Sequence, residues 1–190
     1  MALPELTNFS LVGGTALALK FGHRISVDLD LFSSEPFDQE LVLNALSKEF
    51  GSNFLYEGRN VKFGIFCYIS NIKVDIVHYP HPAIAPIENT QRIRLYSTED
   101  IVAMKVNAIL GRGVKKDFYD IYELLSVYSI QQFIDAYYEK YPRQMLLISI
   151  PEALTYFADA EETEAPISLK GQTWEKVKQQ IQKAVNEYLK

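Results

Sequence analysis

The chain has almost no cysteine and no long apolar run, and both absences exclude classes of protein. Cys67 is the single cysteine among 190 residues, so an intramolecular disulfide framework is excluded and a reducing cytosol fits. No apolar stretch is long enough to span a bilayer, and the N-terminus lacks the basic region of a secretory signal. We therefore expect a cytoplasmic protein without a membrane partner.

Positive charge and histidine are also scarce. The 19 basic residues are outnumbered by 24 acidic ones, and the net charge of −5 argues against broad, non-specific binding of nucleic acid. A local basic cleft stays open as an interpretation, with these candidates: Arg92, Arg94, Arg112, Lys115 and Lys116. His78 and His81 do not make a zinc site without further ligands, and no Ser-His-Asp or Cys-His spacing indicates a covalent nucleophile.

The strongest positive signal is a pair of carboxylates in an apolar segment, Val27-Asp28-Leu29-Asp30-Leu31. Side chains alternate along a strand, so a strand here places Asp28 and Asp30 on one face. Two like charges side by side repel and resist desolvation, and a divalent cation such as Mg²⁺ between them removes the conflict. The pattern predicts a metal site for phosphate chemistry. Two solvated aspartates on a surface strand are the alternative.

A glycine pair precedes this segment. Gly13-Gly14-Thr15 follows an apolar, extended entry and leads into a helix predicted over residues 15–21 that ends at Gly22. Glycines at such a turn let backbone N–H groups approach a phosphate, and the helix N-terminus attracts negative charge. Arg24 and Ser26 follow within reach of a triphosphate. The alternative is a tight turn with Thr15 as a helix cap.

A third carboxylate lies on a predicted hairpin. Residues 61–69 and 72–77 form its two strands, joined at Ser70-Asn71. Asp75 is the single acid in an otherwise apolar strand, which is unusual at a central position. It is either a solvated residue of an edge strand or a further metal ligand.

Two later helices carry more charged residues. A helix predicted to start at Ser97-Thr98-Glu99-Asp100 places Lys105 beside its apolar stripe, either as packing or facing a cleft. A second helix begins near Lys115, and its residues Asp117 and Asp120 share one side. Acids in a first turn also stabilise a helix simply through its dipole.

Together, the segment GGTALALKFGHRISVDLDLF and the later run KVNAILGRGVKKDFYD resemble the nucleotidyltransferase superfamily, in particular its AbiEii/AbiGii branch. That branch contains the toxins of type IV toxin–antitoxin and abortive-infection systems. The resemblance covers about residues 9–126. It implies an enzyme that moves a nucleoside monophosphate from an NTP to an acceptor hydroxyl of tRNA or protein. It also implies an antitoxin, encoded nearby, as a partner.

The resemblance assigns roles to individual residues. It implies that Asp28, Asp30 and Asp75 hold two Mg²⁺ ions, with Mn²⁺ as a substitute. It implies that Gly13, Gly14, Thr15 and Lys105 bind the nucleotide, and Arg24 and Ser26 join this predicted set by their position just before the metal strand. By the same resemblance, Asp117 or Asp120 positions or deprotonates the acceptor, and Lys105 contacts the nucleotide.

Length and pattern predict an α+β fold, with a nucleotidyltransferase-like mixed sheet flanked by helices and then a C-terminal helical bundle. Residues 1–96 mix strands and helices and form the expected catalytic core. Residues 97–190 are almost all helical in pattern, and we expect them to complete the active site and pack on the core. Residues 161–164 are expected to form an acidic, mobile loop, and Thr173 to cap a final amphipathic helix.

Two functions of other classes stay open. One is a catalytically silent module that binds nucleotide and acts through a partner; nucleotide affinity without turnover would identify it. The other is a DNA- or RNA-binding protein without catalysis, which the acidic net charge and the absence of a recognition motif disfavour.

Overall fold

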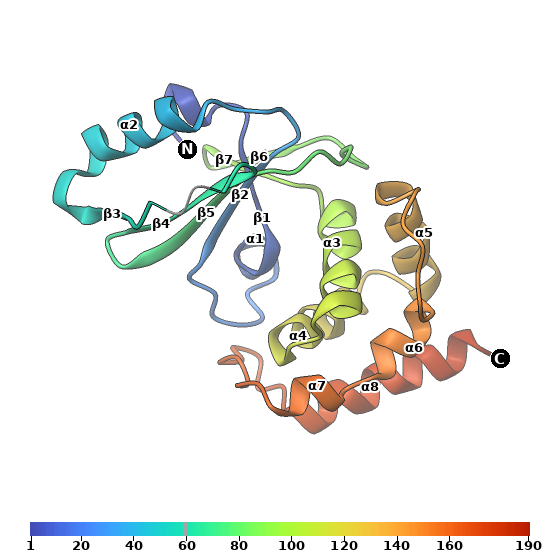
Figure 1. Ribbon diagram of the computed structural model, residues 1–190. Helices are drawn as coiled ribbons and strands as arrows, with labels where there is room; N and C mark the ends of the chain where they lie inside the picture. Colours follow the sequence, from blue (N-terminus) through green and yellow to red (C-terminus); the bar gives the residue numbers. More distant parts are fainter. Residues whose placement is uncertain (59–60) are drawn as a thin grey trace. The chain divides into compact units, whose positions relative to one another are not determined.

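The computed structural model describes residues 1–58 and 61–190, and the chain forms two compact units (Figure 1). Unit 1 consists of Met1–Ala16 and Ser26–Ser97. Unit 2 consists of Leu17–Ile25 and Thr98–Lys190. The boundary falls inside helix α1 (Gly13–Phe21), so the two ends of this helix belong to different units.

Within the described residues, unit 1 is built on a seven-stranded mixed sheet in the order β3-β4-β5-β2-β1-β7-β6 (Figure 1). Its strands are β1 (Ser10–Val12), β2 (Leu29–Ser33), β3 (Phe54–Tyr56), β4 (Gly64–Ile69), β5 (Ile72–His78), β6 (Glu88–Thr90) and β7 (Ile93–Leu95). The pairs β2–β5 and β1–β7 are parallel, and the other neighbours are antiparallel. Two short 3-10 helices (Pro4–Leu6 and Gly51–Asn53) and helix α2 (Gln39–Phe50) complete the unit.

One face of this sheet is apolar and lies against α2. A pocket of about 360 Å³ on that face is lined mainly by apolar side chains, among them Leu29, Leu31, Leu46, Val74 and Ile76. Four of these residues alternate with Asp30 on β2 and with Asp75 on β5. Because successive strand side chains point to opposite faces, the two carboxylates lie on the other side of the sheet.

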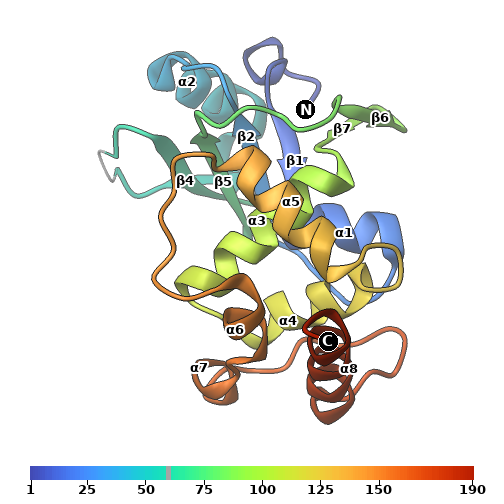
Figure 2. The same ribbon diagram turned by 90° about the vertical axis from the view of Figure 1, so that its right-hand side faces the viewer.

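Unit 2 is almost entirely helical (Figure 2). Its helices after α1 are α3 (Thr98–Gly111), α4 (Lys115–Leu124), α5 (Ile130–Lys140), α6 (Ile150–Thr155), α7 (Ala158–Glu161) and α8 (Trp174–Tyr188). Helix α3 packs against α4, α5 and α6, and α8 packs against α4 and α6. The hydroxyl of Thr173 accepts the N–H of Lys176, so the predicted cap of the last helix is confirmed.

An aromatic cluster fixes the start of α8. The Trp174 ring lies 5.7 Å from the rings of both Phe118 and Phe157, measured between centroids. Its indole Nε1 donates to a Glu161 carboxylate oxygen at 2.9 Å, and Lys178 Nζ lies 2.7 Å from the other. Glu161 also closes α7, so the expectation of a mobile loop over residues 161–164 is wrong at this residue.

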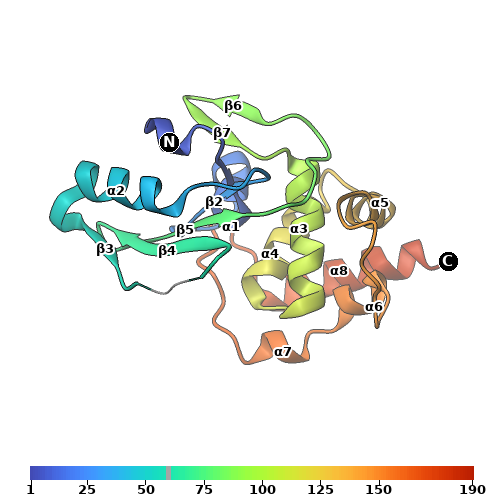
Figure 3. The ribbon, with the colours of Figure 1, turned by 45° about the horizontal axis from the view of Figure 1, so that its top comes forward.

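Two hairpins turn through pairs of residues with positive φ (Figure 3). Ser70 (50°) and Asn71 (66°) join β4 to β5, which confirms the predicted turn. Gln91 (49°) and Arg92 (67°) join β6 to β7 in the same way. This second hairpin was not predicted, because neither residue type signals a left-handed turn.

The predicted α+β fold, a mixed sheet with helices followed by a helical bundle, is confirmed. Two strands begin later than the sequence suggests. β2 begins at Leu29 rather than residue 27, because the carbonyl of Asp28 accepts the Thr15 hydroxyl instead of joining the ladder. β4 begins at Gly64 because its N–H closes a turn onto the carbonyl of Val61. Among the helices of the described residues, none combines the length and apolarity needed to cross a membrane.

Candidate active site

Two of the three predicted metal ligands are neighbours in the sheet of unit 1. Asp30 of β2 and Asp75 of β5 are paired in register on adjacent parallel strands. Paired residues on adjacent strands point to the same face, so both carboxylates project from the side opposite α2. Like charges at paired positions destabilise a sheet, which indicates that this pair serves a purpose other than stability.

Asp28 does not belong to the same strand. The predicted strand over residues 27–31 is wrong at its start, because β2 begins at Leu29, and the shared face of Asp28 and Asp30 stays a prediction. Asp28 instead ends the segment before β2, where it is half-buried. Its charge still acts on the Lys73 ammonium on β5, as do the charges of Asp30 and Asp75. The three carboxylates therefore contribute to one negative field.

The backbone of Gly13 lies directly against Asp30. Gly13 has φ +71°, and a Cβ added to it would lie 2.7 Å from Asp30 Oδ2. An L side chain is disfavoured there twice, by the backbone conformation and by collision with the carboxylate. The glycine at position 13 is thus explained by the close approach of the α1 N-terminus to the β2 carboxylate. Helix α1 begins at Gly13, two residues before the predicted start.

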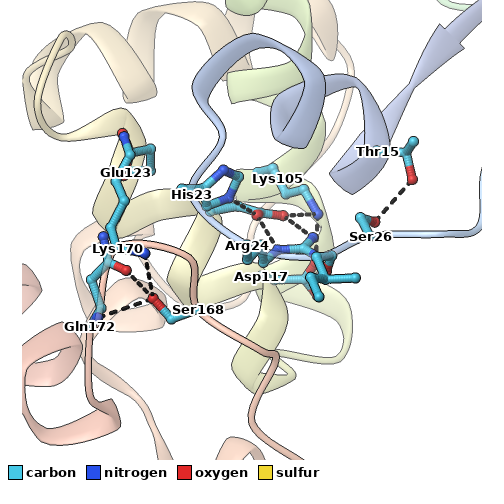
Figure 4. Close-up of polar contacts among 12 residues, drawn as sticks. Thr15, His23, Arg24, Ser26, Lys105, Asp117, Glu123, Ser168, Lys170 and Gln172 are labelled. Carbon is cyan, nitrogen blue, oxygen red and sulfur yellow. Dashed lines mark hydrogen bonds and ion pairs between the residues drawn. The ribbon is translucent and has the colours of Figure 1, made fainter.

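Thr15 links the start of α1 to the segment before β2. Its buried hydroxyl donates to the carbonyl of Asp28 and lies 2.9 Å from Ser26 Oγ (Figure 4). These contacts hold Gly13-Gly14, Ser26 and Asp28 in a fixed local arrangement within unit 1. The Thr15 side chain therefore positions its neighbours, and its hydroxyl is already engaged by protein.

Lys73 supplies the positive charge at the carboxylates. Its Nζ lies 2.6 Å from Asp75 Oδ2, while Asp75 Oδ1 is buried and accepts no hydrogen bond. Partial burial lowers the pKa of Lys73, but the hydrogen bond that its ammonium donates to Asp75 and the charges of Asp75, Asp30 and Asp28 raise it above its usual value. Lys73 was missed as a functional residue, although it shares a strand face with Asp75.

The donor set suits a hard cation. Carboxylate oxygens are the ligands that Mg²⁺ prefers, and the orphaned Oδ1 of Asp75 is a buried acceptor without a donor. In the part of the chain that the structure describes, no three acidic, histidine or cysteine side chains converge closely enough to form a complete metal site. The residues fit a cation that is shared with substrate oxygens better than one held by protein alone.

Unit 2 contains a second cluster of predicted site residues, and it is a buried ion network (Figure 4). Lys105 Nζ of α3 lies 2.8 Å from Asp117 Oδ1 and 2.6 Å from Asp120 Oδ2 of α4. The Arg24 guanidinium donates to Asp120 through Nε at 2.7 Å and Nη2 at 2.9 Å. His23 Nε2 lies 2.7 Å from Asp120 Oδ1. Asp120 of α4 thus connects His23 and Arg24, which follow α1, to Lys105 of α3.

Burial and charge balance dominate this network. Asp117 and Asp120 are 0% exposed, Arg24 4% and Lys105 6%. Burial alone would raise the pKa of Asp120, but the Lys105 charge and the hydrogen bonds from His23 and Arg24 hold it well below its usual value. Burial likewise lowers the pKa of Lys105, and the charges of Asp120 and Asp117 raise it above its usual value. Two cations and two carboxylates neutralise one another.

The shared side of Asp117 and Asp120 is confirmed by their common partner Lys105. Asp117 keeps one oxygen, Oδ2, without a hydrogen bond, and the largely exposed Arg112 lies 3.4 Å from it. His23 is a further, buried partner of Asp120, and no local sequence signal reveals a contact 97 residues away.

Other candidates are used structurally. The Arg94 guanidinium donates to three carbonyls near the N-terminus, those of Met1, Leu6 and Phe9. Lys115 Nζ donates to the carbonyls of Glu161 and Thr163. Burial, with a smaller effect of the Asp75 charge, raises the pKa of the Cys67 thiol to about 11, so it stays protonated and is a poor nucleophile.

Comparison with known proteins connects this geometry to a family. The model of the nucleotidyl transferase AbiEii toxins of type IV toxin–antitoxin systems matches residues 2–188. The uncharacterized protein aq_aa25 of Aquifex aeolicus is 31% identical over 196 residues, which cover 100% of this chain and 92% of the relative.

Solved structures share the fold at low sequence identity. MenT4, a nucleotidyltransferase toxin of Mycobacterium tuberculosis, is similar with a TM-score of 0.62 at 15% identity, over 95% of this chain and 76% of its own. JHP933 of Helicobacter pylori is similar with a TM-score of 0.55 at 14% identity, over 95% of this chain and 83% of its own. Since the family model spans nearly the whole sequence, the chain belongs to the AbiEii family of nucleotidyltransferase toxins, whose activity is nucleotidyl transfer.

Proposed function

We propose that this protein transfers a nucleoside monophosphate from an NTP to the hydroxyl of tRNA or a protein, as the toxin of a type IV toxin–antitoxin pair. In this reaction the acceptor oxygen bonds to the α-phosphorus, the bond from that phosphorus to the bridging oxygen breaks, and pyrophosphate leaves. The acceptor proton passes to a carboxylate. An antitoxin encoded nearby is the proposed partner.

One observation carries the proposal: Asp30 and Asp75 lie in register on adjacent strands, with the Gly13 backbone against Asp30. Two neighbouring carboxylates repel unless positive charge meets them, and Lys73 contacts only Oδ2 of Asp75 while the buried Oδ1 has no donor. A glycine is needed where a Cβ would displace the Asp30 carboxylate. Both features are explained if a cation and the phosphates of an NTP bind at the N-terminus of α1, beside Asp30.

We assign phosphate binding in unit 1 to Gly13, Gly14 and Ser26. The positive φ of Gly13 opens the first turn of α1, where free backbone N–H groups and the helix dipole favour an anion. Thr15 belongs to the same predicted set, and its hydroxyl orients Ser26 and the Asp28 carbonyl.

Divalent metal, Mg²⁺ with Mn²⁺ as a substitute, is the proposed cofactor, with Asp28, Asp30 and Asp75 as the residues that would hold it. When bound, the metal supplies positive charge for the phosphate oxygens and lowers the pKa of the acceptor hydroxyl. The protein's own part is to position the carboxylates and to leave a buried acceptor atom, Asp75 Oδ1, available to the cation.

In unit 2, the resemblance assigns Lys105 and Arg24 to the nucleotide and Asp117 or Asp120 to the acceptor. Of the two acids we favour Asp117 as the base, because its Oδ2 accepts no hydrogen bond. Asp120 is a poor base, since its pKa is held far below the usual value. We propose residues 1–96 as the catalytic core and residues 97–190 as the region that completes the site.

The test is transfer by purified protein from each labelled NTP, with Mg²⁺ and total RNA or lysate, in a matched pair of glycine variants. Gly13→Ala and Gly22→Ala introduce a Cβ at similar φ, +71° and +59°, but Gly22 has nothing within 4 Å of the new atom. We expect Gly13→Ala to abolish transfer and Gly22→Ala to retain it. Equal activity of the two variants would contradict the proposed site.

A further inference from the structure

The Lys73 side chain extends along β5 to the carboxylate of Asp75, two residues further on. The two residues are two positions apart on β5 and share its face. Their atoms Nζ and Oδ2 lie 2.6 Å apart, and Lys73 is 44% exposed whereas Asp75 is 14% exposed. A partly exposed cation is therefore paired with a largely buried anion.

This ammonium lies at the carboxylate pair of the sheet. Asp75 contacts it, and Asp30 is the register partner of Asp75 on the adjacent strand. The ammonium thus lies in the negative field in which the predicted metal would bind.

We propose that Lys73 is an internal counter-cation that occupies the carboxylate site in the metal-free protein and leaves when a divalent cation binds. The inference rests on the proposed function only in taking Asp28, Asp30 and Asp75 as cation ligands. Without Lys73, the largely buried carboxylate of Asp75 would lose its ion-pair partner in the metal-free state. With it, the fold is stable before metal arrives, and metal binding becomes a competition.

A pocket beside Lys73 has room for its side chain when the ammonium leaves Asp75. A pocket of about 180 Å³ on this side of the sheet is lined by Lys73 and Asp75 together with Glu57, Phe66 and Tyr68. The exposed carboxylate of Glu57 offers the ammonium a second partner in that pocket. Because Lys73 is 44% exposed, water can solvate its ammonium once it leaves, and the incoming cation replaces its charge at Asp75.

Replacement of Lys73 by a neutral residue should then have two opposite effects. The affinity for a divalent cation rises, because the competing ammonium is gone. The melting temperature in chelator falls, because the carboxylates repel, and added cation raises it more than in the unaltered protein. A lysine that only packs on the surface produces neither effect.

The test measures Mn²⁺ binding by titration calorimetry and by electron paramagnetic resonance at low ionic strength, on the full chain without nucleotide. Lys73→Met and Lys73→Gln are compared with Lys48→Met, a change of an exposed lysine on α2. We expect the Kd for Mn²⁺ to fall about two- to fivefold in both Lys73 variants and to stay constant in the control. Melting with and without Mn²⁺ provides the second readout.

An unchanged or raised Kd in both Lys73 variants, with binding intact in the unaltered protein, would overturn the inference and leave the proposed function standing. Absence of Mn²⁺ binding in every form, including the unaltered protein, would overturn the inference, and the transfer assay with NTP would then decide the proposed function by itself. Loss of Mn²⁺ binding in Asp75→Asn, together with tighter binding in the Lys73 variants, is the pattern that supports both.

Discussion

Replacement of Asp120 by asparagine should cost this protein more stability than any surface change. Asp120 is fully buried and contacts three side chains: Lys105 at 2.6 Å, His23 at 2.7 Å, and Arg24 at 2.7 and 2.9 Å. The substitution keeps the size of the side chain and removes its charge. Two buried cations then face one carboxylate, Asp117, instead of two.

The magnitude follows from that imbalance. Removal of one member of a buried, hydrogen-bonded charge network typically destabilises a protein by about 3 to 5 kcal/mol, because the remaining charge is left uncompensated. Asp120 is 0% exposed, so solvent screening gives little relief. For a protein of this length, such a loss lowers the melting temperature by about 6 to 20 °C.

The assay is thermal and urea unfolding of Asp120→Asn beside Asp159→Asn, which changes an exposed aspartate of α7 and should stay within about 0.5 kcal/mol of the unaltered protein. The pKa of Asp120 is lower in the folded state than its ordinary value of 3.8, so its stabilising effect is present above that value. As the pH falls below 3.8 the effect is lost, and the difference between the two proteins should shrink. A shift of less than 1 kcal/mol at pH 7 would refute the network.

The remaining predictions concern both units. Lys105→Ala should lower the free energy of unfolding by about 3 kcal/mol or more, and the melting temperature with it. Nucleotide binding must therefore be compared at a temperature where the variant is folded. Asp75→Asn should abolish transfer yet leave the fold intact by circular dichroism; unfolding would indicate a structural role instead. Gly13→Ala and Gly22→Ala should each lose about 1 to 2 kcal/mol of stability from the left-handed backbone, and Gly13→Ala should lose more because its Cβ meets Asp30, so their activities are compared where both variants are folded.

Much of the fold follows from local sequence signals. Asp38, Ser129 and Thr173 cap helices α2, α5 and α8 through short-range hydrogen bonds, and such caps can be predicted from neighbouring residues alone. Alternation along 72–77 likewise predicted β5, and Ser70-Asn71 predicted its turn. The β6–β7 hairpin had no such signal, since Gln91 and Arg92 adopt positive φ only because the sheet requires it.

The candidate site was predictable in its residue types but not in its contacts. The pairing of Asp30 with Asp75 depends on a strand order that places β5 beside β2, and that order is set by tertiary packing. The burial of Lys105 could not be read from a helix pattern that places it at the edge of an apolar stripe. The contact of His23 with Asp120 joins residues 97 positions apart, beyond any local rule.

The most direct test of nucleotidyl transfer compares two labels on the same NTP. Purified protein is incubated with Mg²⁺, cellular RNA and protein, and an NTP labelled either at the α- or at the γ-phosphate. Transfer of a nucleoside monophosphate predicts that the α-label becomes covalently attached to an acceptor, while the γ-label is released as pyrophosphate, and that Asp30→Asn does neither. Attachment of the γ-label, or tight nucleotide binding with no attached label under any condition, would contradict the account.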